Sequence, residues 1–340
     1  SDEMDRFQWE DRYGMQSGQL VMTTQATKGS DSNRIDSAEA TALFVEDRFT
    51  TGAMTITAGA RYEEITVKRD DWGKTDPDRS EIPSKREHTI DVVVPGIGVE
   101  YAINESQTVS VGIHKGFAPP GPGTSGVTDK AVDPETSMNT EIGFKSNKGL
   151  NSLEFTLFMN SYDNLLGADT AASGGGSDDL FNGGAVDISG FELYLRRILV
   201  DNGRIQMPLE LAWTNTNSEF QESFDGFWGD VSKGDELPYL PDTMIALNLG
   251  LNVDKISANI SMKKTSEMRT VAGSGSISGS NATDELTIID LGLRYALQDN
   301  IRLSVGINNF MDDDGVVSRR PCGARPTMPR SFSLGVDYTF

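Results

Sequence analysis

The last nine residues decide the fold, and they read Phe332-Ser333-Leu334-Gly335-Val336-Asp337-Tyr338-Thr339-Phe340. An apolar side chain stands at every second position of this stretch. Successive side chains of a β-strand point to opposite faces, so the spacing predicts a strand with one apolar and one polar face.

The same alternation recurs along most of the chain, whereas no segment shows a comparably strong period of 3.6 residues. The clearest upstream examples are residues 301–308, 291–297, 245–253, 207–214, 153–160 and 56–62. The sequence therefore predicts an all-β, antiparallel, up-and-down protein.

The connections between the predicted strands come in two sizes that alternate. Short turns are expected near residues 50–52, 104–106, 146–149, 201–203, 254–255 and 298–300, and Asn202-Gly203 suits a type I′ turn. Long polar loops are expected at about 69–87, 116–135, 163–184, 218–238, 269–284 and 312–328. Tight turns on one rim and long loops on the other are typical of a transmembrane β-barrel of the outer membrane. A soluble all-β protein is the alternative.

Composition excludes several classes of protein. The chain of 340 residues carries 30 basic and 51 acidic side chains, a net charge of −21, which argues against a nucleic-acid partner. Cys322 is the single cysteine, so neither an internal disulfide nor a cysteine-based zinc site is possible within the chain. No apolar run is long enough for a transmembrane helix.

Counting the predicted strands gives about fifteen, from 3–13 and 18–25 at the start to 329–340 at the end. Single-chain bacterial barrels have an even number of strands and both termini in the periplasm. An odd count with a descending last strand therefore predicts a missing strand before Ser1 and two open sheet edges.

Several ordered segments carry a family resemblance. They are Gly112 to Gly121 (GIHKGFAPPG), Asn139 to Lys145 (NTEIGFK), Leu237 to Pro241 (LPYLP), Asn308 to Asp312 (NNFMD), and the Arg319 to Phe332 region with its Arg-Pro pairs. In this order they resemble TonB-dependent outer-membrane receptors, in particular those for ferric dicitrate and other siderophores. The resemblance implies that residues 1–340 form the C-terminal part of a 22-stranded barrel, with the N-terminal plug domain and the first strands absent.

The resemblance also implies a function and a set of partners. The expected activity is TonB-dependent import of a ferric siderophore or other metal chelate, possibly ferric citrate-like, across the outer membrane of a Gram-negative bacterium. The expected partners are the chelate, the TonB complex through the missing plug, membrane lipid and lipopolysaccharide, and the assembly machinery that recognises Phe340. No cofactor is expected. The alternatives are a passive porin-type or structural barrel and, third, a soluble β-rich adhesin or carbohydrate-binding domain.

Candidate site residues follow from these expectations. Catalysis has little support, because His88 and His114 belong to no catalytic or metal-binding motif. An anionic chelate suits arginine, which bonds oxyanions in bidentate fashion. The candidate ligand contacts are Arg319, Arg320, Arg325, His114 and Phe117. The arginines could instead pair with lipopolysaccharide phosphate or with the acidic run Asp312 to Asp314.

A second group of charged residues is expected on the polar face, toward the lumen. It comprises Arg61, Glu141, Lys145, Glu154, Arg294 and Arg302. These side chains could hold a polar plug, or they could pair with one another across neighbouring strands.

Overall fold

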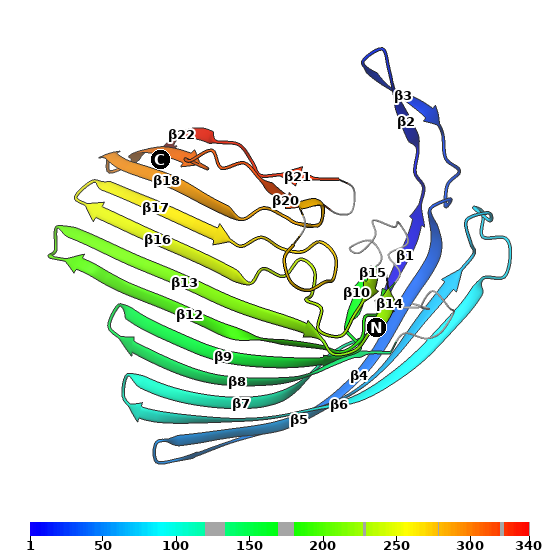
Figure 1. Cartoon of the computed structure of the whole chain (residues 1–340), viewed down its shortest axis with the longest axis horizontal. Helices are drawn as coiled ribbons and strands as arrows, with labels where there is room; N and C mark the ends of the chain where they lie inside the picture. The colour runs from blue at the N-terminus through cyan, green and yellow to red at the C-terminus, as the bar shows by residue number, and fades with distance from the viewer. Residues whose placement is uncertain (120–132, 169–179, 227–228, 278, 320–322, 340) are drawn as a thin grey trace.

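An antiparallel 14-stranded sheet forms the body of the molecule (Figure 1). The structure is a computed structural model that describes residues 1–119, 133–168, 180–226, 229–277, 279–319 and 323–339. The strands of the sheet, in spatial order, are β1 (Asp2–Gln8), β4 (Ser32–Thr51), β5 (Met54–Asp71), β6 (Ser84–Asn104), β7 (Gln107–Ala118), β8 (Glu135–Lys148), β9 (Asn151–Asp163), β12 (Val186–Asp201), β13 (Ile205–Phe220), β16 (Thr243–Val253), β17 (Ile256–Thr265), β18 (Leu286–Gln298), β19 (Ile301–Asn308) and β22 (Ser331–Tyr338).

Small two-stranded hairpins lie at one rim of this sheet. They are β2 (Arg12–Gln16) with β3 (Gln19–Thr24), β10 (Leu166–Ala168) with β11 (Leu180–Asn182), β14 (Phe224–Gly226) with β15 (Gly229–Val231), and β20 (Val316–Ser318) with β21 (Arg325–Pro326). A single 3₁₀ turn, η1 (Gly279–Asn281), is the only helical element of the described ranges. None of the helical structure described could cross a membrane.

The two rims confirm the predicted alternation of short and long connections. The turns after β4, β6, β8, β12, β16 and β18 are short, and the small hairpins all lie in the connections between them. The type I′ prediction at Asn202-Gly203 is wrong, because only Gly203 has a positive φ there, of 81°. The side chain of Asn202 instead accepts hydrogen bonds from the backbone N–H groups of Arg204 and Ile205.

The beginning of the chain corrects the predicted strand count. Residues 18–25, expected as a strand of the barrel, form β3 and pair with β2 in a hairpin of their own. Their apolar residues alternate, but the hairpin stands on the rim within the connection from β1 to β4 (Figure 1). The sheet therefore has 14 strands. Because this number is even, the strand count by itself does not indicate a missing strand.

The predicted open edges are present. β1 pairs only with Ser32 to Ala38 of β4, so Glu39 to Thr51 have no partner strand on that side among the described residues. β22 pairs with β19 alone within the same ranges. Unpaired strand edges template further pairing in water and are not tolerated in lipid.

The two faces of the sheet differ in chemistry. Ile97, Val111 and Ile142 lie on one face with about half of their surface exposed, at 53%, 48% and 52%. No second sheet packs along this face in the described ranges, because the strands of the 14-stranded sheet make extensive contacts only with their neighbours in that sheet. A soluble β-sandwich would bury such a face, so the exposure favours an apolar surrounding medium.

Buried apolar residues occur on β5 and β6, at Ile65, Val67, Ile90 and Val92, and in a cluster at the rim of the long loops. Val186, Phe220 and Val231 are buried there, and Phe224 and Leu237 pack against them. Here β14–β15 and its flanking segments fold over the ends of β12 and β13. The described part of the connection between β13 and β16 thus packs against the ends of these strands.

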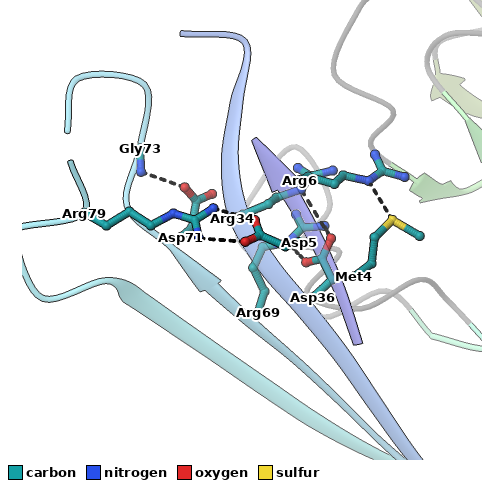
Figure 2. Close-up of polar contacts among 9 residues, drawn as sticks. All are labelled: Met4, Asp5, Arg6, Arg34, Asp36, Arg69, Asp71, Gly73 and Arg79. Carbon is teal, nitrogen blue, oxygen red and sulfur yellow. Dashed lines mark hydrogen bonds and ion pairs between the residues drawn. The ribbon is translucent and has the colours of Figure 1, made fainter. Parts of the chain in front are cut away.

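Arg79 fastens the loop between β5 and β6 to β1. Its guanidinium group bonds both carboxylate oxygens of Asp5, at 2.6 and 3.0 Å (Figure 2). The same group donates to the side-chain oxygen of Asn33, at 2.8 Å. It also lies over the rings of Phe7 and Trp72, at 5.4 and 4.7 Å from their centroids. The bond from Arg79 lowers the pKa of Asp5. Its contribution is therefore present at neutral pH and is lost as the pH falls through that lowered value.

We predict that Arg79→Ala frees β1 from the sheet edge. Loss of the charged hydrogen bonds and the ring contacts should lower the local opening free energy by about 1–2 kcal/mol, or roughly 5- to 30-fold in exchange rate. Hydrogen exchange of residues 2–8 and 32–38 measures this. Lys74→Ala, a basic residue of the same loop, is the control, and equal exchange in both variants would contradict the role of Arg79.

Candidate functional site on the polar face

A cavity of about 570 Å³ lies on the polar face of β4 to β7, and Gly59, Gly96, Gly98 and Gly112 are among its lining residues. The strand register aligns Gly59, Gly96 and His114 in one row across β5, β6 and β7. The next row aligns Thr57, Gly98 and Gly112. Because the four glycines of these rows carry no side chain, they leave a hollow that Arg61 and His114 border. The polar face is therefore the hollowed side of the sheet.

A second cavity of about 310 Å³ continues the hollow toward the short turns. It shares Thr57, Gly98 and Gly112 with the first, and its charged lining residues are Arg48, Glu100 and Glu141. Arg48 and Glu100 form an ion pair of 3.4 Å across the strand between them. Charged residues of both signs thus line the hollow along its length.

The charged residues expected on one polar face do share it. The register places Arg61, Glu141, Lys145, Glu154, Arg294 and Arg302 on the face that carries Gly59 and Gly112 or its continuation along the sheet. Lys145 and Glu154 are directly opposite and form an ion pair of 2.8 Å. Arg61 bonds Glu63, two residues along the same strand, at 2.5 Å. These exposed pairs each contribute little to stability.

His114 and Phe117 do not come together. They are three residues apart on one strand, so their side chains lie on opposite faces. His114 lines the cavity, where its Cβ would lie 3.1 Å from a Cβ added at Gly96. Phe117 lies on the apolar face, opposite Thr136.

The last loop uses Arg319 as a brace. Its guanidinium group donates to the carbonyl oxygens of Ala282, at 2.5 Å, and Gly279, at 2.9 Å, and its backbone N–H donates to the Tyr239 hydroxyl. Arg325 is exposed on β21. Arg320, Cys322 and Phe340 lie outside the described residues. The described arginines of this loop therefore do not converge on one point.

Arg269 braces the neighbouring loops in the same way. It is 8% exposed, bonds Glu236 at 2.5 Å and donates to the carbonyl oxygen of Gly275. Beside it, burial and the charge of Glu236 raise the pKa of Asp242. These residues border a polar cavity of about 310 Å³ between the loops.

An arginine-rich cluster at the edge of the sheet was not foreseen from the sequence. Arg6, Arg34, Arg69 and Arg86 come from β1, β4, β5 and β6, with Asp36 among them (Figure 2 shows all but Arg86). These residues are far apart in the sequence, so only the register of the strands brings them together. The signal available was the alternation that puts Arg34 and Asp36 on one face.

Within the described ranges, no group of three or more histidine, cysteine, aspartate or glutamate side chains could hold a metal ion.

Comparisons with known proteins extend over most of the chain. The family model described as TonB dependent receptor-like, beta-barrel matches residues 2–310. Among curated protein sequences, none matches.

Solved structures of siderophore receptors share the fold. The siderophore receptor PiuA from Acinetobacter baumannii superposes with a TM-score of 0.73 at 16% identity, over 93% of this chain and 45% of that one. The ferric-catecholate import receptor Fiu from E. coli K12, in its closed form, gives 0.72 at 18% identity, over 94% and 47%. The ferric citrate transporter FecA, unliganded, gives 0.71 at 19%, over 94% and 48%. The chain thus spans slightly less than half of each.

We predict that Gly190→Ala impairs folding of the sheet. A Cβ at Gly190 would collide with the backbone carbonyl of Asn215 and the ring of Phe158, at a cost of about 1–3 kcal/mol. The measure is the folded fraction, seen as heat-sensitive migration in detergent gels. Gly112→Ala is the control, because a Cβ there meets nothing within 4 Å. Equal folding of the two variants would contradict the steric argument.

We also predict that Arg319→Ala loosens the loop between β17 and β18. The carbonyl oxygens of Ala282 and Gly279 would lose their charged donor. Limited proteolysis should cut within residues 266–285 at least about tenfold faster. Arg325→Ala, at an exposed position, should leave the rate unchanged. An unchanged rate in Arg319→Ala would show that the brace is dispensable.

Proposed function

Because this chain belongs to the family of TonB-dependent receptor β-barrels, we propose that it forms the C-terminal barrel portion of an outer-membrane receptor that imports a ferric chelate. The receptor would also contain a plug domain and further strands. The match of the family model to residues 2–310 carries the proposal. The coverage of the solved receptors, 93% of this chain but 45% of PiuA, supports the partial span.

The family consists of outer-membrane receptors rather than enzymes, and the two faces of the sheet suit that setting. In the proposed receptor, the exposed apolar face contacts lipid. Lipopolysaccharide lies at the level of the long loops. The terminal aromatic residue Phe340 would serve the assembly machinery. The polar face, with its hollow beneath His114, would face the lumen.

In the proposed receptor, the charged side chains of the polar face would contact the plug. Ion pairs such as Lys145 with Glu154 are half-exposed, so a polar plug could exchange hydrogen bonds with them at little cost. Plug contacts of this kind could be broken when TonB pulls on the plug. Glu141, Arg294 and Arg302 would offer further contacts of the same kind.

The similar solved structures indicate a class of substrate but no single chelate. PiuA is a siderophore receptor, Fiu imports ferric catecholate and FecA transports ferric citrate, all at 16–19% identity to this chain. Binding and import of a ferric siderophore is the shared activity, and a ferric citrate-like ligand is the narrower proposal.

We predict that the complete receptor confers uptake of radioactive iron from a ferric chelate on cells lacking their own receptor for it. Import driven through a plug needs TonB, so uptake should vanish in cells without TonB. Equal uptake without TonB would indicate a passive pore instead. Failure with ferric citrate, catecholate and hydroxamate alike would exclude an iron receptor.

A cavity variant sharpens this test. Gly112→Leu would fill the hollow, since a Cβ at that position has open space around it. Import should fall severalfold if the plug or the ligand occupies the hollow. Ile113→Leu, the next residue on the opposite, apolar face, should import normally. Normal import by Gly112→Leu would show that the hollow is not used.

A further inference from the structure

The sequence contains the dipeptide Asn-Gly twice, and the two copies lie in different surroundings. Asn182-Gly183 stands at the end of β11, whereas Asn202-Gly203 lies in the short turn between β12 and β13 (Figure 1). In such a dipeptide the unhindered backbone nitrogen of the glycine can attack the side-chain carbonyl carbon of the asparagine. The reaction needs that nitrogen to be free to approach, so the folded surroundings decide which copy reacts.

The side chain of Asn202 is folded back over the turn. Its side-chain oxygen accepts hydrogen bonds from the backbone N–H groups of Arg204, at 3.1 Å, and Ile205, at 2.8 Å. This Asx turn brings the side-chain amide along the next peptide group, which contains the nitrogen of Gly203. The two donors also polarise the amide carbonyl. They would stabilise the negative charge that forms on its oxygen during attack on the carbon, as the donors of an oxyanion hole do.

The attacking nitrogen would be that of Gly203, and a carboxylate already accepts its hydrogen. The N–H group of Gly203 donates to Oδ1 of Asp201 at 3.2 Å, which is within the reach of a general base. Gly203 is exposed and has a φ of 81°, and a Cβ added to it would meet nothing within 4 Å. Water can therefore reach the turn, and ammonia can leave it.

The other copy of the dipeptide is held by strand pairing. Asn182 is the last residue of β11 and lies opposite Leu166 of β10. Gly183 is buried, and its N–H group donates to the backbone carbonyl oxygen of Leu165 at 2.6 Å. An attack by this nitrogen would break a buried backbone hydrogen bond, which is costly. The same two residues are therefore protected at one place and exposed to reaction at the other.

We propose that Asn202 is a site of spontaneous deamidation, promoted by the turn itself and with Asp201 as the proton acceptor. The nitrogen of Gly203 bonds to the side-chain carbonyl carbon of Asn202, and its proton passes to Asp201. The bond from that carbon to the amide nitrogen then breaks, the proton passes to the departing nitrogen, and ammonia leaves. Water opens the resulting succinimide ring, which gives aspartate or isoaspartate at position 202.

The product suits the same hydrogen-bond donors. A carboxylate at position 202 can accept from the N–H groups of Arg204 and Ile205, and its charge strengthens such bonds. It also adds a negative charge beside Asp201, and an isoaspartate lengthens the backbone of the turn by one carbon. The modification would thus change both charge and chain length at the rim of short turns. The reaction does not depend on the proposed function.

The test incubates the complete protein, folded in detergent, in mildly alkaline buffer and follows both sites by mass spectrometry after digestion with trypsin. Cleavage after Arg197 and Arg204 releases Asn202 within the peptide 198–204. Conversion at Asn202 should be at least about tenfold faster than at Asn182. It should also be faster than in the free peptide 198–204, which has the same dipeptide without the folded turn.

Two variants test the role of the carboxylate. Asp201→Ala should slow conversion at least about tenfold through loss of the proton acceptor. Asp254→Ala is the matched control, because it removes the same charge from the neighbouring turn, where Asp254 pairs with the side chain of Arg204. Its rate should stay close to that of the unaltered protein.

Two results would overturn the proposal. Conversion at Asn202 that is no faster in the folded protein than in the free peptide would show that the turn does not promote the reaction. Equal rates in Asp201→Ala and Asp254→Ala would exclude Asp201 as the proton acceptor. Neither result bears on import of a ferric chelate.

Discussion

The pairing of backbone hydrogen bonds is the constraint on which the rest of this structure depends. Each central strand satisfies its N–H and C=O groups only through both neighbours, so the strands follow one another in a continuous antiparallel ladder. Where the ladder stops, at the edge of β4 beyond Ala38 and at β22, backbone groups need another strand. A sheet of this kind is stable in lipid only as part of a closed wall.

The ladder also fixes the chemistry of the two faces. Since the side-chain period is two, a strand with continuous register keeps its apolar residues on one face and its polar residues on the other. Rows of glycine such as Gly59 with Gly96, and Gly98 with Gly112, then become hollows in the polar wall. Exposed ion pairs such as Lys145 with Glu154 add charge to the wall at little gain in stability.

At the long-loop rim, a different set of interactions takes over. Arg269 and Arg319 donate to backbone carbonyl oxygens of neighbouring loops, and Arg79 joins a loop to the first strand. These arginines are structural because their guanidinium groups donate hydrogen bonds to acceptors within the chain. Arg34 differs from them, since its Nε is buried without a hydrogen bond.

By itself, the sequence determined the all-β class, the alternation of short and long connections and the shared face of residues such as Arg61 and Glu154, because period two is a local property. The same alternation already separates His114 from Phe117. Only the tertiary structure decided that β3 forms a rim hairpin, that Arg319 braces backbone carbonyls, and that Arg6, Arg34, Arg69 and Arg86 lie together. Those outcomes depend on which strand pairs with which and in what register, and pairing between distant segments leaves no local pattern.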